Sequence, residues 1–157
     1  MKQLEGKTYL IPRDPPYPSN TLEVLLYKQA MHAITQEKVC TLFEQNGWEP
    51  PWFNGIYNYH HFHSEAHEVL AVTRGSISVQ LGGPGGEIFH LTMGDIILLP
   101  AGVAHKRIES SEDYEIAGSY PSGQSPDLRK GSHEEWEEVL NNISKVKLWK
   151  KNPVTGD

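Results

Sequence analysis

Two histidines and a glutamate are spaced in this sequence so that they could hold a metal ion. His61 and His63 lie two residues apart, and Glu68 follows after a short polar break at residues 64–66. Successive side chains of an extended strand point to opposite faces, so residues at i and i+2 share one face. Both imidazoles could therefore reach one ion, and a returning strand could bring the Glu68 carboxylate beside them.

The histidine pair also has a simpler interpretation. Histidines beside aromatic residues are often half-buried packing residues whose ring nitrogens bond to a backbone carbonyl. The pair alone would favour a packing role. A second group of residues favours a metal site instead, because it has the spacing of another hairpin. That hairpin would deliver a third imidazole, and its residues are Gly94, Pro100, Gly102 and His105.

The two stretches resemble the paired motifs of the cupin superfamily. The first motif, G-x5-H-x-H-x4-E-x6-G, is matched from Gly55 to Gly75 without a gap. The second, G-x5-P-x-G-x2-H-x3-N, is matched from Gly94 onward, except that Glu109 stands where the family usually has Asn. The resemblance covers residues 55–109 directly. It implies one metal site with four ligands: His61, His63, Glu68 and His105.

A looser resemblance links the second half of the chain to small single-domain bacterial cupins of unassigned function. It rests on AHEVL at 66–70, LPAG at 99–102 and SYPSGQ at 119–124. This similarity names no substrate.

The implied ligand set favours a functional metal centre. Three imidazoles and one carboxylate suit a divalent transition metal (Fe, Mn, Ni, Zn or Cu), because Mg and Ca prefer more oxygen ligands. In an octahedral geometry four protein ligands leave two positions open, enough for a substrate and dioxygen or for a bidentate substrate. We therefore predict oxygenase-type or isomerase-type chemistry on a small polar metabolite. The alternatives are a non-enzymatic metal-dependent binding or sensing protein, and a storage or structural protein with a stabilising ion.

Three other polar residues are candidates for catalytic roles. Tyr57 and Tyr59 share the strand parity of His61 and could either line the cavity or pack in the core. Glu109 keeps the parity of His105, so it could point inward as a base or lie beyond the edge of the barrel.

The remaining histidines near the motifs are expected to lie away from the ion. His60 and His67 are each adjacent to a predicted ligand, so on strands they should face the opposite side. If the ion were held elsewhere, the alternative ligands would be His60, His67 and His90.

The elements around the motifs predict an all-β fold, a double-stranded β-helix or jelly-roll barrel. Fourteen Gly and eleven Pro in 157 residues suit many tight turns between short strands. A short helix is expected before the barrel, from Thr35 as N-cap to Gly47 at C′. A C-terminal helix is expected to start with a capping box of Ser132 and Glu135. Strands are expected at 21–31, 76–81, 88–93, 96–100 and 114–120.

The length favours one cupin domain over residues 1–157. Within it we expect an N-terminal arm, strand and helix at 1–47, the barrel with both motifs at 48–120, and a C-terminal segment with a helix at 121–157. The stretch at 12–20 has four prolines in nine positions. With the leading strand, this Pro-rich arm is predicted to form a homodimer.

Composition excludes several classes of partner and location. The formal net charge of -6, without a cluster of Lys and Arg on a helical face, argues against nucleic-acid binding. Cys40 is the only cysteine, so no intrachain disulfide forms and a reducing compartment is favoured. Residues 1–12 contain neither a signal-peptide core nor a membrane span. We therefore predict a cytoplasmic protein with a small-molecule ligand and no membrane partner.

Overall fold

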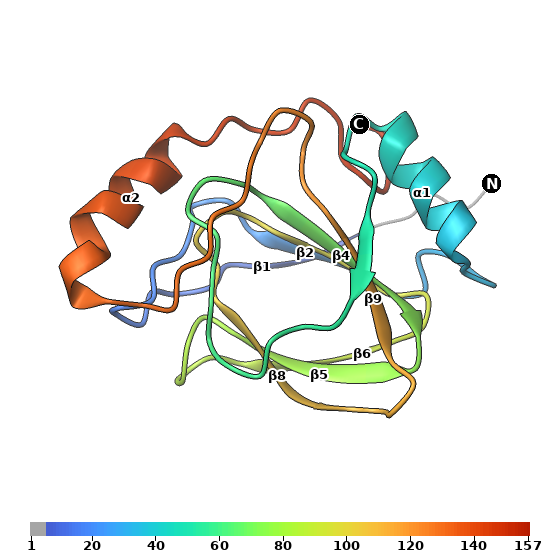
Figure 1. Ribbon diagram of the computed structural model, residues 1–157, viewed down its shortest axis with the longest axis horizontal. Helices are drawn as coiled ribbons and strands as arrows, with labels where there is room; N and C mark the ends of the chain where they lie inside the picture. Colours follow the sequence, from blue (N-terminus) through green and yellow to red (C-terminus); the bar gives the residue numbers. More distant parts are fainter. Residues whose placement is uncertain (1–5) are drawn as a thin grey trace.

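Residues 6–157, the part of the chain described by the computed structural model, form two antiparallel sheets that pack face to face (Figure 1). The strands are β1 (Lys7–Tyr9), β2 (Val24–Tyr27), β3 (Trp52–Asn54), β4 (Glu68–Arg74), β5 (Ser76–Leu81), β6 (Ile88–Thr92), β7 (Ile96–Leu99), β8 (His105–Ser110) and β9 (Glu115–Ser119). The larger sheet has the order β1-β2-β7-β4-β9-β3, and the smaller has the order β6-β5-β8. The predicted jelly-roll architecture is confirmed.

Alternating side chains build the core between the sheets. Leu70 and Val72 of β4 face Ile77 and Val79 of β5, and all four are at most 4% exposed. The intervening residues of β4 point to the other face of the larger sheet, where they join a second apolar cluster. All four residues of β7 are buried, as expected of a strand covered on both sides.

Helix α1 (Gln36–Gln45) covers the outer face of the larger sheet. It begins and ends as predicted: the Thr35 side chain accepts a hydrogen bond from the Lys38 backbone N–H at 3.1 Å, and Gly47 has a φ of 79°. Two strands of the sheet precede α1 in the chain. The helix is therefore inserted between β2 and β3 and does not stand ahead of the barrel.

The leading strand is shorter than expected and is not an edge. The predicted strand at 21–31 is confined to β2, which pairs with β1 on one side and β7 on the other. The edges of the larger sheet are β1 and β3. Among residues 6–157, the edge nearest to the predicted dimer contact therefore belongs to β1, a strand that the sequence patterns did not indicate.

The C-terminal helix α2 (Trp136–Lys145) is preceded by a single 3-10 turn, η1 (His133–Glu135). The predicted capping box is wrong, because Ser132 makes no side-chain capping bond and Glu135 instead pairs with Arg129 at 2.7 Å. No helix within the described residues is long and apolar enough to span a lipid bilayer. The expectations for residues 1–5 lie outside the described part of the chain.

Candidate metal site

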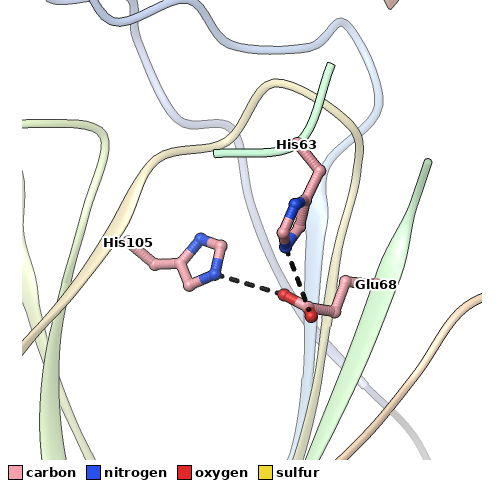
Figure 2. A group of neighbouring side chains, drawn as sticks. All are labelled: His63, Glu68 and His105. Atoms are coloured by element: carbon pink, nitrogen blue, oxygen red, sulfur yellow. Dashed lines mark ion pairs between the residues drawn. The ribbon is translucent and has the colours of Figure 1, made fainter. Parts of the chain in front are cut away.

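Three of the four predicted ligands meet at the open end of the core (Figure 2). Ligand atoms of His63, Glu68 and His105 all lie within 4.8 Å of one another. Glu68 stands between the two rings, with Oε2 3.4 Å from His63 Nε2 and Oε1 3.1 Å from His105 Nε2. Glu68 and His105 are each 3% exposed, so the cluster is shielded from bulk water.

Main-chain bonds hold the two motif segments together at this point. His61 and His105 form an isolated antiparallel bridge, with N to O distances of 3.2 and 2.9 Å. The Gly102 N–H donates to His63 O at 2.8 Å. Gly102 has a φ of 91°, and a Cβ there would come within 2.9 Å of Ser19 O. Only glycine fits this corner without strain, which explains its place in the second motif.

His61 lies beside the cluster but outside its tightest group. Its ring centroid is 4.1 Å from that of His105 and 6.1 Å from that of His63, and it lines the same cavity. The segment that carries His61 and His63 is not the regular strand we expected, because only His61 and Phe62 make isolated bridges. The two imidazoles still line the same cavity.

All three imidazoles are oriented by hydrogen bonds through Nδ1. The acceptors are backbone carbonyl oxygens: Tyr59 for His61 at 3.0 Å, Val103 for His105 at 3.1 Å, and Asp127 for His63. A carbonyl only accepts, so Nδ1 must carry the proton in each ring. In a neutral ring Nε2 is then the nitrogen with a free lone pair, as a metal ligand requires.

The charges of the cluster depend on one another. Burial raises the pKa of Glu68, but the neighbouring His63 and His105 outweigh it and hold that pKa well below its ordinary value. Burial lowers the pKa of His63, but the Glu68 carboxylate outweighs burial and raises the pKa to about 9. Burial, aided by His105, lowers the pKa of His61 to about 3. His61 is therefore neutral at pH 7, and without an ion His63 and Glu68 form an ion pair.

The buried carboxylate tests whether these residues fit a metal ion. Glu68 Oε1 has no hydrogen-bond partner within residues 6–157, although His105 Nε2 lies 3.1 Å away. Leaving a buried anionic oxygen unsatisfied is costly, and a divalent cation among nitrogen and oxygen ligands would satisfy it. The donor set thus fits a transition metal. The identity of the metal does not follow from it.

A cavity of about 570 Å³ opens in front of the cluster. Of the tyrosine candidates, Tyr57 stands at its rim with 53% of the residue exposed. Tyr59 is outside the lining and stacks on Tyr57, with ring centroids 4.9 Å apart. A role in contacting ligand therefore remains for Tyr57, while Tyr59 supports its ring.

Glu109 lies on the outer face of the smaller sheet, away from the cavity. Arg107 pairs with Val79, but Glu109 pairs with Ser78, so the register of β8 against β5 shifts by one residue at Ile108. This β-bulge reverses the parity that we extrapolated from His105. The inward orientation of Glu109 is therefore corrected. Glu109 also does not lie beyond the edge of the barrel, because it is part of β8 and pairs with Ser78.

The other histidines lie outside the cluster. His67 points to the opposite side of the sheet from Glu68, and its Nδ1 accepts from the Ala101 N–H at 2.9 Å. His60 packs on Tyr17 with ring centroids 5.4 Å apart. His90 pairs with the hydroxyl of Ser78 at 2.6 Å, on the outer face of the smaller sheet.

Sequence reasoning missed three side chains near the ion site. Tyr120 stands edge-on to His63 at 5.8 Å, and its oxygen accepts from Trp52 Nε1 at 3.0 Å. Asp127 positions His63 through its backbone. Arg107 lines the cavity and shares the parity of His105, a signal that could have found it. Tyr120 and Asp127 follow the last regular strand, where no periodicity indicates which way a side chain points.

Comparison with known proteins gives one similar protein at substantial identity. The "Uncharacterized protein YjlB" of Bacillus subtilis (strain 168) is 34% identical over 154 residues, covering 97% of this chain and 92% of that protein. No protein-family model matches the chain.

Solved structures similar to this chain were found at low identity. RmlC from Streptococcus suis in complex with dTDP-D-xylose is 14% identical, with a TM-score of 0.43 over 94% of this chain and 98% of that one. Acireductone dioxygenase from Bacillus anthracis, with a cadmium ion in its active centre, is 14% identical, with a TM-score of 0.43 over 66% and 82%. A DUF861 family protein from Thermotoga maritima is 19% identical, with a TM-score of 0.38 over 61% and 97%.

Proposed function

This chain belongs to the same family as YjlB of Bacillus subtilis, and from this premise and from its two cupin-type motifs we propose that it is a metal-dependent enzyme of the cupin kind acting on a small polar metabolite. One observation carries the proposal: a buried carboxylate with an unsatisfied oxygen lies beside imidazoles whose Nδ1 atoms are already occupied. An adjoining cavity of about 570 Å³ supports a functional centre over a purely structural one.

His63, Glu68 and His105 would hold the ion, with His61 as the fourth ligand. When bound, the ion would supply Lewis-acid or oxygen-activating chemistry. Tyr120 would hold a proton near the substrate, because burial above all raises the pKa of its phenol and because Trp52 already donates to its oxygen. The nearby Glu68 carboxylate also raises that pKa, so the O–H of Tyr120 is held beside the ion site.

Turnover assays with metal-loaded protein test the proposal. We expect iron- or manganese-loaded protein to convert at least one member of a panel of small polar metabolites, followed by oxygen consumption for an oxygenase and by NMR for an isomerase. Replacing Glu68 by Gln should abolish the activity, whereas His90→Ala, on the outer face, should keep it. Saturable ligand binding without conversion would favour the binding or sensing function instead.

We also propose that the chain is a homodimer whose contact includes the N-terminal edge of the larger sheet. Within residues 6–157 one side of the β1 strand has no neighbouring strand, and edges of this kind commonly pair with a second chain. The Pro-rich arm at 12–20 follows β1 and would lie at the same contact. Light scattering should give a mass of twice the 17.7 kDa of one chain. A monomer at micromolar concentration would rule the dimer out.

A further inference from the structure

We propose that Arg107 recognises an oxyanion group, a carboxylate or a phosphate, on the small molecule that enters the cavity. Arg107 has no place in the ligand set of the metal site. It lines the same cavity as Glu68 and His105, and no carboxylate of residues 6–157 forms an ion pair with it.

Strand β8 positions the guanidinium beside the ion site. Arg107 follows His105 by two residues and precedes the bulge, so both side chains point to the inner face. Two residues of a strand span about 6.6 Å, so the ion site and the guanidinium are separated by roughly the length of a small organic acid. The backbone N–H of Arg107 donates to Tyr57 O at 2.9 Å, which holds this part of the strand against the cavity rim.

Most of the guanidinium remains available for binding. Its Nε donates to Ile56 O at 3.1 Å, and its Cζ lies 5.6 Å from the centroid of the Tyr114 ring. Within residues 6–157 no carboxylate oxygen lies within 4.0 Å of its nitrogens. The N–H groups of the two terminal nitrogens are thus free to donate to a ligand. The hydrogen bond to Ile56 O and the contact with the Tyr114 ring hold the guanidinium in one orientation.

The other acids of the cavity are already engaged. Glu68 faces the histidines. Asp127 accepts from Arg129 Nε at 2.8 Å and from the Ser64 N–H and hydroxyl at 2.7 and 2.5 Å. Neither carboxylate neutralises the positive charge of Arg107. An incoming anion would therefore be the first group to neutralise it.

These features define the class of ligand. A guanidinium presents parallel N–H donors that match the oxygens of a carboxylate or a phosphate, and such pairs are among the stronger polar contacts in proteins. The inference rests on the proposed function only for the second anchor, at which other oxygens of the ligand would face the ion. The expected ligands are small organic acids or phosphate esters, and neutral sugars are disfavoured.

Calorimetry on the full chain, with and without Mn²⁺, tests the inference. The carboxylate probe is malonate, with neutral malonamide of similar size as its control. The phosphate probe is glycerol 3-phosphate, with glycerol as its control. We expect each anion to bind more tightly than its neutral partner, and Arg107→Ala to weaken the anions by about ten- to hundredfold while leaving the neutral probes unchanged. Whichever anion binds more tightly identifies the group.

Lys106→Ala is the matched control, because it removes the same charge from the adjacent residue, which pairs with Gln80 and points away from the cavity. If Arg107→Ala does not fold, Arg107→Gln, which keeps an amide donor for Ile56 O, decides the question. Equal anion binding by wild type and the Arg107 variant, an equal loss in Lys106→Ala, or no preference of the wild type for anions would overturn the inference. Mn²⁺ binding in the same samples reports separately on the metal site.

Discussion

Mn²⁺ or Zn²⁺ at a hundredfold excess over its dissociation constant is expected to raise the melting temperature of the wild-type protein by about 5–11 °C. An ion bound only by the folded chain at this excess adds about 2.7 kcal/mol, and each kcal/mol shifts the melting temperature of a chain of this size by about 2–4 °C. His105→Ala should show a smaller shift. The double variant His61→Ala/His63→Ala should show none.

The order follows from what each variant leaves behind. Without His105, the His61 and His63 rings and the Glu68 carboxylate still face the cavity, and many divalent metals accept two imidazoles and one carboxylate. Without His61 and His63, only Glu68 and His105 remain, and two ligands on opposite sheets do not hold an ion at this excess.

The measurement is thermal melting of each metal-free variant with and without the ion. His90→Ala is the control, since His90 lies on the outer face and should keep the full shift. Equal metal-induced shifts in the wild type and both ligand variants would mean that the ion binds elsewhere.

The second large effect is a dependence of metal binding on pH that ends near pH 9. In the metal-free protein His63 has a pKa of about 9, so an ion that takes its Nε2 at pH 7 must displace a proton. We expect about one proton to be released per ion at pH 7 and the dissociation constant to fall about tenfold per pH unit from 7 to 9. Above pH 9 both effects should disappear.

Glu68→Gln should remove this dependence as well as weaken the binding. Without the carboxylate, burial is the main influence on His63 and lowers its pKa, so the ring is already neutral at pH 7. Calorimetry in buffers of different ionisation enthalpy counts the released protons directly. A wild-type protein that releases none at pH 7 would show that His63 is not charged before the ion binds.

The raised pKa of His63 also makes the stability of the metal-free protein depend on pH. A value raised from 6.5 to about 9 means that the folded state binds the proton more tightly than the unfolded chain. Its contribution is therefore complete below pH 6.5 and is lost as the pH rises through 9. Glu68 acts in the opposite sense, because its pKa is lowered on folding. Its contribution to stability is therefore present at pH values above the ordinary pKa of a glutamate and is lost as the pH falls through the lowered pKa.

The fold and the cluster were predictable where local rules agree. The limits of α1 followed from a capping threonine and a glycine, and the placement of His67 away from Glu68 followed from alternation. The resemblance of the two motifs to those of cupins implied His61, His63, Glu68 and His105, of which the structure groups His63, Glu68 and His105 most tightly. These features depend on residues close to one another in the chain, or on a register that alternation preserves.

The remaining features depend on a strand irregularity and on long-range contacts, neither of which the alternation of polar and apolar residues indicates. One extra residue at Ile108 sends Glu109 outward, and nothing in the sequence HKRIES indicates where a bulge will occur. Glu135 was expected to cap α2 but is bonded to Arg129, a competition that only the tertiary structure reveals. Asp127 reaches His63 from 64 residues away in the sequence.

The partners that orient the three histidines are all main-chain oxygens, those of Tyr59, Val103 and Asp127. Any amino acid has such an oxygen, so these three positions can change residue type without losing the contact. The orientation of the rings thus depends on the path of the backbone. Related proteins can differ in residue type at these three positions and still keep the imidazoles in the same orientation. Insertions or deletions near residues 59, 103 and 127 should then be more damaging to the site than substitutions at the same places.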